Sequence, residues 1–329
     1  MLCPLADGGD GTVESAKLSI GGNLHSLQVR GADGKSVTAQ WLEFGSDGKD
    51  DEKQALVELA NSCGIGYLDA QDLQPLSAST FGLGEVIADC YRRGIRHIKV
   101  GVGGSASTDG GMGALTALGV QFFAKDGTTV PPAGGGALHQ IHTCSLTELI
   151  LHNCTIEILT DVRNPLLGED GAAKVFSPQK GADQNTVKLL DSALSHFADV
   201  LERASGRDCR DIAGTGAAGG AAFGLACALG ATIGSGFDWI AETSRLNDKI
   251  ERSSLVITGE GKFDSQSLNG KVIGSLARRC LERGRPLWVV AGAAEPLPGG
   301  NGVDKLIVPL TNGHFCTEQD IKNAVARSF

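Results

Sequence analysis

The segment that most constrains the fold is residues 96–119, RHIKVGVGGSASTDGGMGALTALG. Residues 98–102 are mostly apolar and predict a short buried strand, and leucines at helical spacing from Met112 predict a helix. The loop between them is rich in glycines and hydroxyls: Gly101, Gly103, Gly104, Ser105, Ser107 and Thr108. Strand, glycine loop and helix start together predict an α/β unit with an anion site, because N–H groups converge there and the helix N-terminus is positive.

The loop matches named motifs only in part. It has no G-x-x-x-x-G-K-[ST] and is not a Walker loop. Gly101-x-Gly103-x-x-Ala106 fits the dinucleotide fingerprint, and Asp126 follows at the distance of a ribose-binding acid. Phosphate binding, dinucleotide binding and a tight turn without ligand all remain open for this loop on its own.

Composition excludes several classes of protein. The 329 residues carry a net charge of −9, which argues against a nucleic-acid partner because no basic stripe is available to neutralise phosphates. The nine cysteines form no C-x-x-C pair, which is typical of reduced thiols in the cytoplasm. Glycine is unusually frequent, with 47 residues placed mainly between expected strands and helices. These glycines indicate ligand-binding turns.

A second glycine cluster, Gly214–Gly220, lies near the start of an uncharged run from Ile212 to Phe237. Gly214-x-Gly216-x-x-Gly219 matches the dinucleotide fingerprint, but no clear strand precedes it, so the match is discounted. Glycines at membrane-helix spacing raise the question of a membrane span. The run is mostly alanine and glycine, which gives little apolar drive for insertion, so a close-packed buried helix is expected instead.

The remaining patterns predict an α/β fold. Residues 24–30 and 36–44 alternate around Asp33-Gly34 and predict a hairpin, and residues 50–62 are interpreted as a helix. Near the end, the apolar runs 255–258, 287–291 and 306–310 predict parallel buried strands.

Acidic residues flank several of these elements. Asp7 and Asp10 lie among glycines in ADGGDGT, where they either cap a turn or reach a metal or a substrate hydroxyl. Asp161 follows the strand predicted over 155–160, at the end where open α/β sheets bind ligands. A lone Asp there also fits a simple turn cap. The segment GEGKFDSQS then places Glu260, Lys262 and Asp264 beyond another strand end, and this density of charge favours a functional site.

Taken together, these segments resemble the bacterial-type glycerate kinase family, also called type I. The resemblance covers the chain in order: ADGGDGT, STFGLGEVI, GVGGSASTDGGMGAL, GGGAL, DVRNPLLG, AAKVFSPQKGA, GTGAAGG and VITGEGKFDSQS. It implies phosphorylation of D-glycerate with ATP and Mg²⁺, usually to 2-phosphoglycerate, in a cleft between two domains. Nucleotide and glycerate are then the partners, without nucleic acid or membrane, and a homodimer is compatible with the family.

The resemblance also implies two unlike α/β domains. Residues 1–14 and 246–329 are expected to form a Rossmann-like parallel-sheet domain, and residues 15–245 a larger mixed α/β domain inserted into it. Compared with the family pattern, the chain is expected to lack an N-terminal strand and a Pro-Asp-Ser-aromatic-Lys loop.

Phosphoryl transfer depends on positioning and charge neutralisation, which suggests roles for the matching residues. Asp161 is expected to orient or deprotonate the glycerate hydroxyl, and Lys180 or Lys262 to neutralise the transferring group. Asp7 and Glu260 are expected at the metal or at a hydroxyl. The other expected nucleotide-binding residues are Gly103, Gly104, Ser105, Ser107, Gly216, Gly219 and Asp264.

Two other functions compete with this one. An NAD(P)-binding oxidoreductase would use the loop at 101–106 with Asp126, but it does not explain ADGGDGT, DVRNPLLG or GEGKFDSQS. A non-catalytic homologue would keep the glycine loops and bind ligand without turnover.

Overall fold

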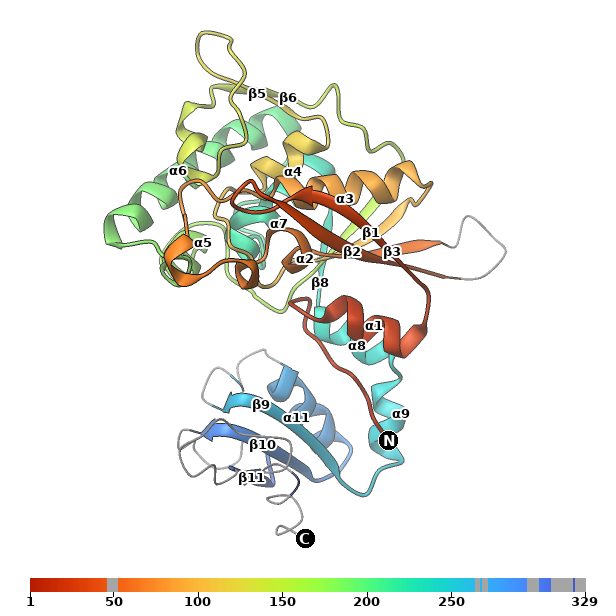
Figure 1. The fold of residues 1–329 in the computed structure, drawn as a ribbon. Helices are drawn as coiled ribbons and strands as arrows, with labels where there is room; N and C mark the ends of the chain where they lie inside the picture. Colours follow the sequence, from red (N-terminus) through yellow and green to blue (C-terminus); the bar gives the residue numbers. More distant parts are fainter. Residues whose placement is uncertain (46–52, 264–266, 268–271, 295–301, 309–321, 323–329) are drawn as a thin grey trace. The chain divides into compact units, whose positions relative to one another are not determined.

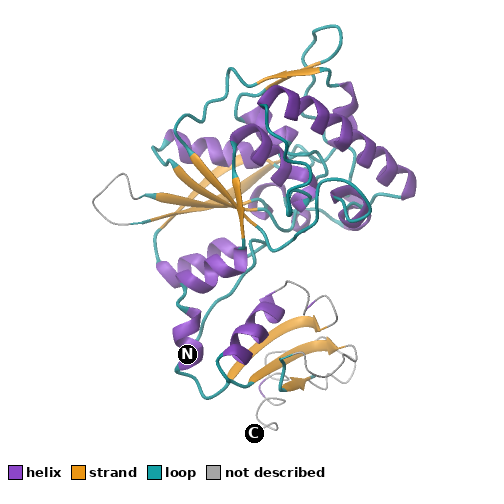
Figure 2. Cartoon of the chain, turned by 180° about the vertical axis from the view of Figure 1, so that it is seen from behind, coloured by secondary structure: helices purple, strands orange, loops and turns teal. Residues whose placement is uncertain are grey.

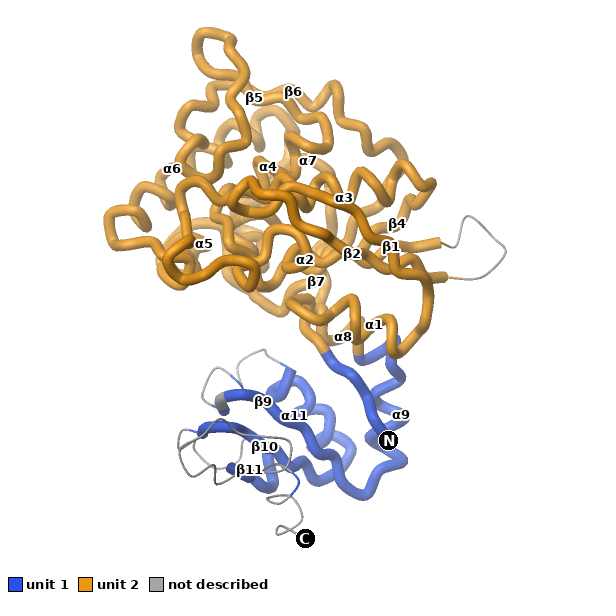
Figure 3. Tube along the Cα trace, in the orientation of Figure 1, with its two compact units in different colours: residues 1–5, 241–329 blue, residues 6–240 orange. Residues whose placement is uncertain are grey.

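The computed structural model describes residues 1–45, 53–263, 267, 272–294, 302–308 and 322. The chain divides into two compact units, a larger one over Ala6–Ile240 and a smaller one made of Met1–Leu5 and Ala241–Phe329 (Figure 3). Along the sequence, the larger unit is therefore inserted into the smaller one.

Both boundaries differ from the expected ones. Residues 241–245 were expected in the larger unit and lie in the smaller one. Residues 6–14 were expected in the smaller unit and lie in the larger one. The reason is a buried contact, because the backbone N–H groups of Gly11 and Val13 donate to the carboxyl group of Glu58 in the larger unit.

The larger unit is built on a six-stranded mixed sheet in the order β1-β2-β3-β4-β7-β8. The hairpin expected at the start of this sheet is confirmed, with Asn23 paired to Glu43 and Arg30 to Ser36. Strand β3 is antiparallel to β2, and β3, β4, β7 and β8 run parallel. The strands span Asn23–Arg30 (β1), Ser36–Phe44 (β2), Gln54–Glu58 (β3), His97–Gly101 (β4), Thr155–Leu159 (β7) and Thr232–Gly234 (β8).

The helix expected over residues 50–62 is wrong. Residues 54–58 form strand β3, which pairs on both sides, and among the described residues 53–63 only Ala60–Cys63 (α2) are helical. Ala55, Leu56 and Val57 are fully buried, so both faces of this strand are apolar. A short, continuous apolar run does not reveal by its periodicity whether it is a strand or a helix.

Helices cover both faces of this sheet (Figures 1 and 2). Helices α1 (Thr12–Ile20) and α8 (Gly236–Thr243) lie on one side, and α3 (Phe81–Arg92), α4 (Met112–Ala117), α6 (Gln184–Ser205) and α7 (Ala221–Leu229) lie on the other. Shorter elements are α5 (Ala172–Phe176), β5 (Gln121–Phe123), β6 (Thr143–Ser145) and the 3-10 turns Ile65–Tyr67, Ala70–Asp72, Gly135–Gln140, Pro178–Lys180 and Ala217–Gly220.

The uncharged run after residue 212 contains the buried helix α7, as expected. Residues 221–228 of this helix are all buried. A Cβ on Gly224 would lie 2.2 Å from the carbonyl oxygen of Gly110, so the absence of a side chain lets the backbones approach. In the part of the chain that the structure describes, no helix is both long and apolar enough to cross a membrane.

The smaller unit contains a three-stranded parallel sheet in the order β11-β10-β9, as its apolar runs predicted. Val289 pairs with Thr258 on one side and with Leu306 on the other. Its elements are α9 (Leu246–Glu251), β9 (Val256–Phe263), α11 (Val272–Glu282), β10 (Leu287–Ala294) and β11 (Lys305–Ile307). The expected α/β fold class is confirmed.

Two glycines of the N-terminal loop offer a matched test of close packing. Gly8 and Gly11 have similar positive φ angles, +90° and +83°. A Cβ on Gly8 would lie 2.3 Å from the carbonyl oxygen of Leu159, whereas a Cβ on Gly11 would have nothing within 4 Å. We therefore expect Gly11→Ala to cost about 1 kcal/mol of backbone strain, and Gly8→Ala to cost about 1–3 kcal/mol more from overpacking.

Urea denaturation of the two variants and the wild type measures this difference. Equal destabilisation by the two substitutions would contradict the packing of Gly8 against β7.

Candidate active site

The carboxyl ends of four parallel strands meet at one edge of the larger sheet, where α/β proteins commonly bind ligands. Glu58 is the last residue of β3, and Gly101 is the last residue of β4. Asp161 follows the end of β7 by two residues, and Ser235 directly follows β8. This edge therefore gathers two carboxyl groups, a hydroxyl and the start of a glycine loop.

The N-terminal ADGGDG loop lies against these strand ends. Gly103 N donates to Gly8 O at 2.9 Å. The glycines permit this approach, because a Cβ on Gly103 would lie 2.5 Å from the Cα of Gly9, and a Cβ on Gly236 would lie 2.3 Å from the carbonyl oxygen of Asp7. Asp7 is therefore held beside the ends of β4 and β8.

Asp161 is fixed in orientation by the first turn of α8. Its Oδ1 accepts from the Ser235 hydroxyl at 2.6 Å, and its Oδ2 accepts from Phe237 N at 2.9 Å. Burial raises the pKa of Asp161 and outweighs these two bonds, and the negative charges of Asp7 and Asp238 raise it further. A raised pKa makes this oriented carboxylate a stronger proton acceptor than a solvent-exposed aspartate.

Glu58 is the residue of this edge that the sequence reasoning missed. It is only 1% exposed, and its two carboxyl oxygens accept from Gly11 N at 3.0 Å and from Val13 N at 2.9 Å. Burial raises its pKa to about 7, which the two N–H bonds oppose and the nearby Asp10 carboxyl favours. The sequence did contain a signal, because Glu58 directly follows the apolar residues 55–57, as an acid at a strand end would. Interpreting residues 50–62 as a helix hid this signal.

Lys180 binds the first glycine loop from within the protein. It is 2% exposed, and its Nζ donates to Ser105 Oγ at 2.8 Å and to Ser107 O at 2.5 Å. Burial lowers the pKa of Lys180 to about 7, although the negative charge of Asp109 opposes that shift.

Asp109 joins the same loop to the starts of two helices. Its carboxylate is fully buried and accepts from Thr80 N, Thr80 Oγ1, Gly111 N and Gly113 N. Helix α4 begins at Met112 with Gly111 as its N-cap and has no side-chain cap, so Asp109 acts by tying the loop to both helix starts through its bonds to Thr80, Gly111 and Gly113.

The second glycine loop packs directly on the first. Gly110 N donates to Gly219 O at 3.0 Å, and a Cβ on Gly219 would lie 2.2 Å from Ser107 O. Gly216 N donates to Asn164 O at 2.9 Å. The two loops that the sequence identified separately are therefore one packed element beside the strand ends.

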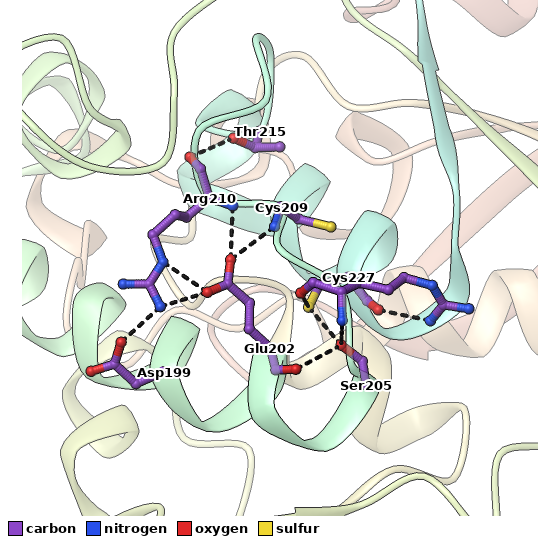
Figure 4. A network of polar contacts seen from close by, with 8 residues as sticks. Asp199, Glu202, Ser205, Cys209, Arg210, Thr215 and Cys227 are labelled. Atoms are coloured by element: carbon purple, nitrogen blue, oxygen red, sulfur yellow. Dashed lines mark hydrogen bonds and ion pairs between the residues drawn. The ribbon is translucent and has the colours of Figure 1, made fainter.

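A polar network anchors the chain just before the second loop (Figure 4). Glu202 of α6 accepts from Cys209 N, from Arg210 N and from the Arg210 guanidinium, which also pairs with Asp199. Thr215 donates to Arg210 O at 3.2 Å. These bonds fix the path of residues 209–215 as they enter the loop.

Several backbone N–H groups expected at phosphates have protein partners instead. Gly103 N donates to Gly8 O, Ala106 N to Cys63 O and Gly216 N to Asn164 O. The hydroxyl groups of Ser107 and Thr108 are buried and have no hydrogen-bond partner within the described chain. Gly104 is the solvent-exposed residue of this stretch.

The smaller unit holds the remaining predicted residues. Glu260 and Lys262 were expected beyond the end of a strand over 255–258, and this was wrong, because β9 continues to Phe263 and includes both residues. The Oε1 of Glu260 is buried without a hydrogen-bond partner among the described residues. Lys262 is the next-to-last residue of the same strand, and Asp264 lies outside the described residues. The described residues contain no group of three or more His, Cys, Asp or Glu side chains able to hold a metal ion.

Comparison with known proteins decides the family. A family model described as the glycerate kinase family matches residues 1–324. The chain belongs to the glycerate kinase family. Its relatives include "Glycerate 2-kinase" of Escherichia coli K12, 37% identical over 94% of this chain and 81% of that protein, and "Glycerate kinase" of Bacillus subtilis 168, 38% identical over 88% and 75%.

The fold comparison agrees. A crystal structure assigned to glycerate kinase 2 of Salmonella typhimurium LT2 superimposes with a TM-score of 0.79 at 34% identity, covering 98% of this chain and 84% of that one. The predicted resemblance is confirmed, and the chain is a kinase. The alternative oxidoreductase assignment needed Asp126 to bind a ribose. Asp126 instead accepts hydrogen bonds from Thr128 in its own exposed turn, which argues against that role.

The packing of Lys180 in this glycerate kinase family member leads to a stability prediction. Lys180→Met removes the donor to Ser105 and Ser107 and leaves buried Asp109 without the positive charge of Lys180. We expect a loss of about 1–3 kcal/mol in the free energy of unfolding, because two buried acceptors lose their donor.

The control is Lys174→Met, because Lys174 pairs with the exposed Glu169. Such surface pairs contribute little, so this variant should unfold like the wild type. If urea denaturation gives the same midpoint for Lys180→Met as for the control, Lys180 does not hold the loop.

Proposed function

We propose that this chain transfers the γ-phosphoryl group of ATP to D-glycerate in the presence of Mg²⁺ and releases 2-phosphoglycerate. Membership of the glycerate kinase family supports the substrate, and the 37% identity to "Glycerate 2-kinase" supports the position of phosphorylation. The single observation that carries the chemistry is the buried, oriented carboxyl group of Asp161 at the end of β7.

Asp161 has the properties of a general base for this reaction. In the proposed step it takes the proton of the glycerate hydroxyl as the oxygen attacks the γ-phosphorus, and ADP leaves. Its raised pKa makes it a better proton acceptor than a solvent-exposed aspartate. The bonds from Ser235 and Phe237 hold the carboxyl group in one orientation, which limits the entropy lost in reaching the transition state.

Carboxylates fit the metal that this reaction needs. Mg²⁺ is usually held by one or two carboxylates together with waters and substrate phosphates, so a closed site of three side chains is not required. We assign Asp7 and Glu260 as the residues that would hold it, and the unpaired buried Oε1 of Glu260 supports this assignment. When bound, Mg²⁺ neutralises charge on the transferring phosphates.

The nucleotide is assigned to the two packed glycine loops. Gly103, Gly104, Ser105 and Ser107 form the first contact region, and Gly216 and Gly219 form the second. The unpaired hydroxyl of Ser107 supports a polar ligand at the first loop. Lys262 and Asp264 of the smaller unit are assigned to the same nucleotide, and the ammonium group of Lys180 acts on this region through Ser105.

The proposed cellular location and partners follow from the same assignment. We propose that it works in the cytoplasm on small molecules, without a nucleic-acid or membrane partner. The net charge of −9 supports the absence of a nucleic-acid partner. We also propose that the enzyme assembles as a homodimer.

A coupled assay with D-glycerate and Mg-ATP tests the proposed reaction. Because enolase consumes 2-phosphoglycerate directly, coupling through enolase should report turnover without added phosphoglycerate mutase. A signal only after mutase is added would indicate the 3-phosphate and contradict the proposed product. Ligand binding without any turnover would favour a non-catalytic homologue.

Asp161→Asn tests the base in the same assay. The amide cannot accept the proton, so we expect kcat to fall by about 10²–10⁴-fold, the usual contribution of general base catalysis. Thermal unfolding should show that the variant remains folded.

Asp33→Asn is the control, because Asp33 lies in the hairpin turn and pairs with Lys35. It should keep wild-type kcat. Wild-type kcat in Asp161→Asn would remove Asp161 from the mechanism.

A further inference from the structure

Glu58 connects the sheet to the loop that carries Asp7. Gly11 and Val13, whose N–H groups Glu58 accepts, come directly after the ADGGD segment and open helix α1. Gly11 is the N-cap of this nine-residue helix and has no side chain that could accept a hydrogen bond. The Glu58 carboxyl group instead accepts bonds at the positive end of the helix. The loop is therefore pinned at two points, by Glu58 at its end and by the bond from Gly103 N to Gly8 O in its middle.

The bonds to Gly11 and Val13 need both oxygens of the carboxyl group as acceptors. Protonation turns one oxygen into a hydroxyl, which donates, so only one acceptor of full strength remains. One of the two backbone N–H groups then loses its partner, at a buried position for Val13 and a partly buried one for Gly11, which is costly. Whether both hydrogen bonds to the loop can form consequently depends on the ionisation of Glu58.

Two titratable groups interact with Glu58. Asp10 lies in the same loop, and its negative charge favours the protonated form of Glu58. Tyr67 follows α2, and its pKa is raised by burial and by the charges of Asp10 and Glu58. Burial itself raises the pKa of Glu58 to about 7. Glu58 thus changes its charge near neutral pH.

We propose that Glu58 is a positioning residue of this kinase: its ionised carboxylate holds the Asp7–Gly11 loop in the arrangement that turnover requires. The sign follows directly. Above pH 7 the carboxylate accepts from both N–H groups and the loop is held. As the pH falls through 7, one bond is lost, the loop loosens and activity declines. The predicted effect of Glu58 on activity rests on the proposed function, whereas its predicted effect on the order of the loop does not.

The first measurement is hydrogen exchange, which needs no activity. Mass spectrometry follows the peptide covering residues 6–20 in the wild type and in Glu58→Gln, with exchange corrected for its intrinsic pH dependence. Glutamine keeps one acceptor and turns its NH₂ towards the other N–H group. At pH 8 we expect exchange at Gly11 or Val13 to be at least about tenfold faster in the variant, as for the loss of one bond to a charged group.

The same experiment contains its own controls. At pH 6 the wild type should exchange like Glu58→Gln, because its carboxyl group is then protonated. A peptide from the hairpin, residues 23–44, should exchange equally in both proteins, which separates loosening of the loop from general destabilisation. Equal protection of residues 6–20 in both proteins at pH 8 would overturn the proposal.

The second measurement is the pH profile of kcat for glycerate phosphorylation. The wild type should lose activity as the pH falls through 7, and this loss should be smaller in Glu58→Gln, which should also have a lower kcat at pH 8. In Asp10→Asn the contribution of Glu58 should move to lower pH, because a neighbouring negative charge has been removed. Protonation of Asp161 contributes an acid limb to all three proteins, so the role of Glu58 is measured as the difference between their profiles.

The outcomes separate the two proposals. An unshifted profile in Asp10→Asn, together with a loss of activity in Glu58→Gln as large as in the wild type, would overturn the role of Glu58 and leave the kinase assignment intact. If the wild type does not phosphorylate glycerate, the proposed function fails, and hydrogen exchange alone then supports or overturns the positioning role.

Discussion

The backbone contact between the ADGGDG loop and the ends of β4 and β7 is the constraint on which the rest of the site depends. A side chain at Gly8, Gly101 or Gly103 would occupy the space that the facing backbone takes up. Only because these positions lack a Cβ can the loop reach the strand ends and bring Asp7 into the neighbourhood of Asp161. The glycines of this region therefore build the site by allowing close packing.

The same principle explains how the two glycine loops combine. Gly219 and Gly224 let α7 and its preceding turn approach the backbone at residues 107–110. Buried Lys180 fixes the first loop through two hydrogen bonds, and buried Asp109 through four. Buried polar and charged groups are tolerated in proteins when they are hydrogen-bonded in this way. The result is a rigid platform of backbone beside the carboxylates at the strand ends.

Much of this arrangement could be predicted from the sequence, for physical reasons that differ by residue. Asp161 was predicted at a strand end because the mostly β-branched and apolar residues 155–160 precede it and the loop DVRNPLLG follows. The family was identified because eight short segments occur in the family order, although none of them is decisive alone. Glu58 was missed because its short strand has two apolar faces, and such a run has no period that distinguishes strand from helix. The sequence also could not show that the N–H groups of Gly103 and Gly216 bind carbonyl groups, because a glycine needed for packing and a glycine needed for a ligand look the same.

The central claim is that glycerate binds at the carboxylates of the larger unit. It is tested most directly by ¹³C NMR of protein labelled at the aspartate carboxyl carbon, with the Asp161 signal assigned by its absence in Asp161→Asn. On addition of D-glycerate, the account predicts that the Asp161 signal shifts and that the signal of Asp33, in the hairpin turn, stays in place. An unchanged Asp161 signal at a glycerate concentration that saturates the kinase would contradict the account.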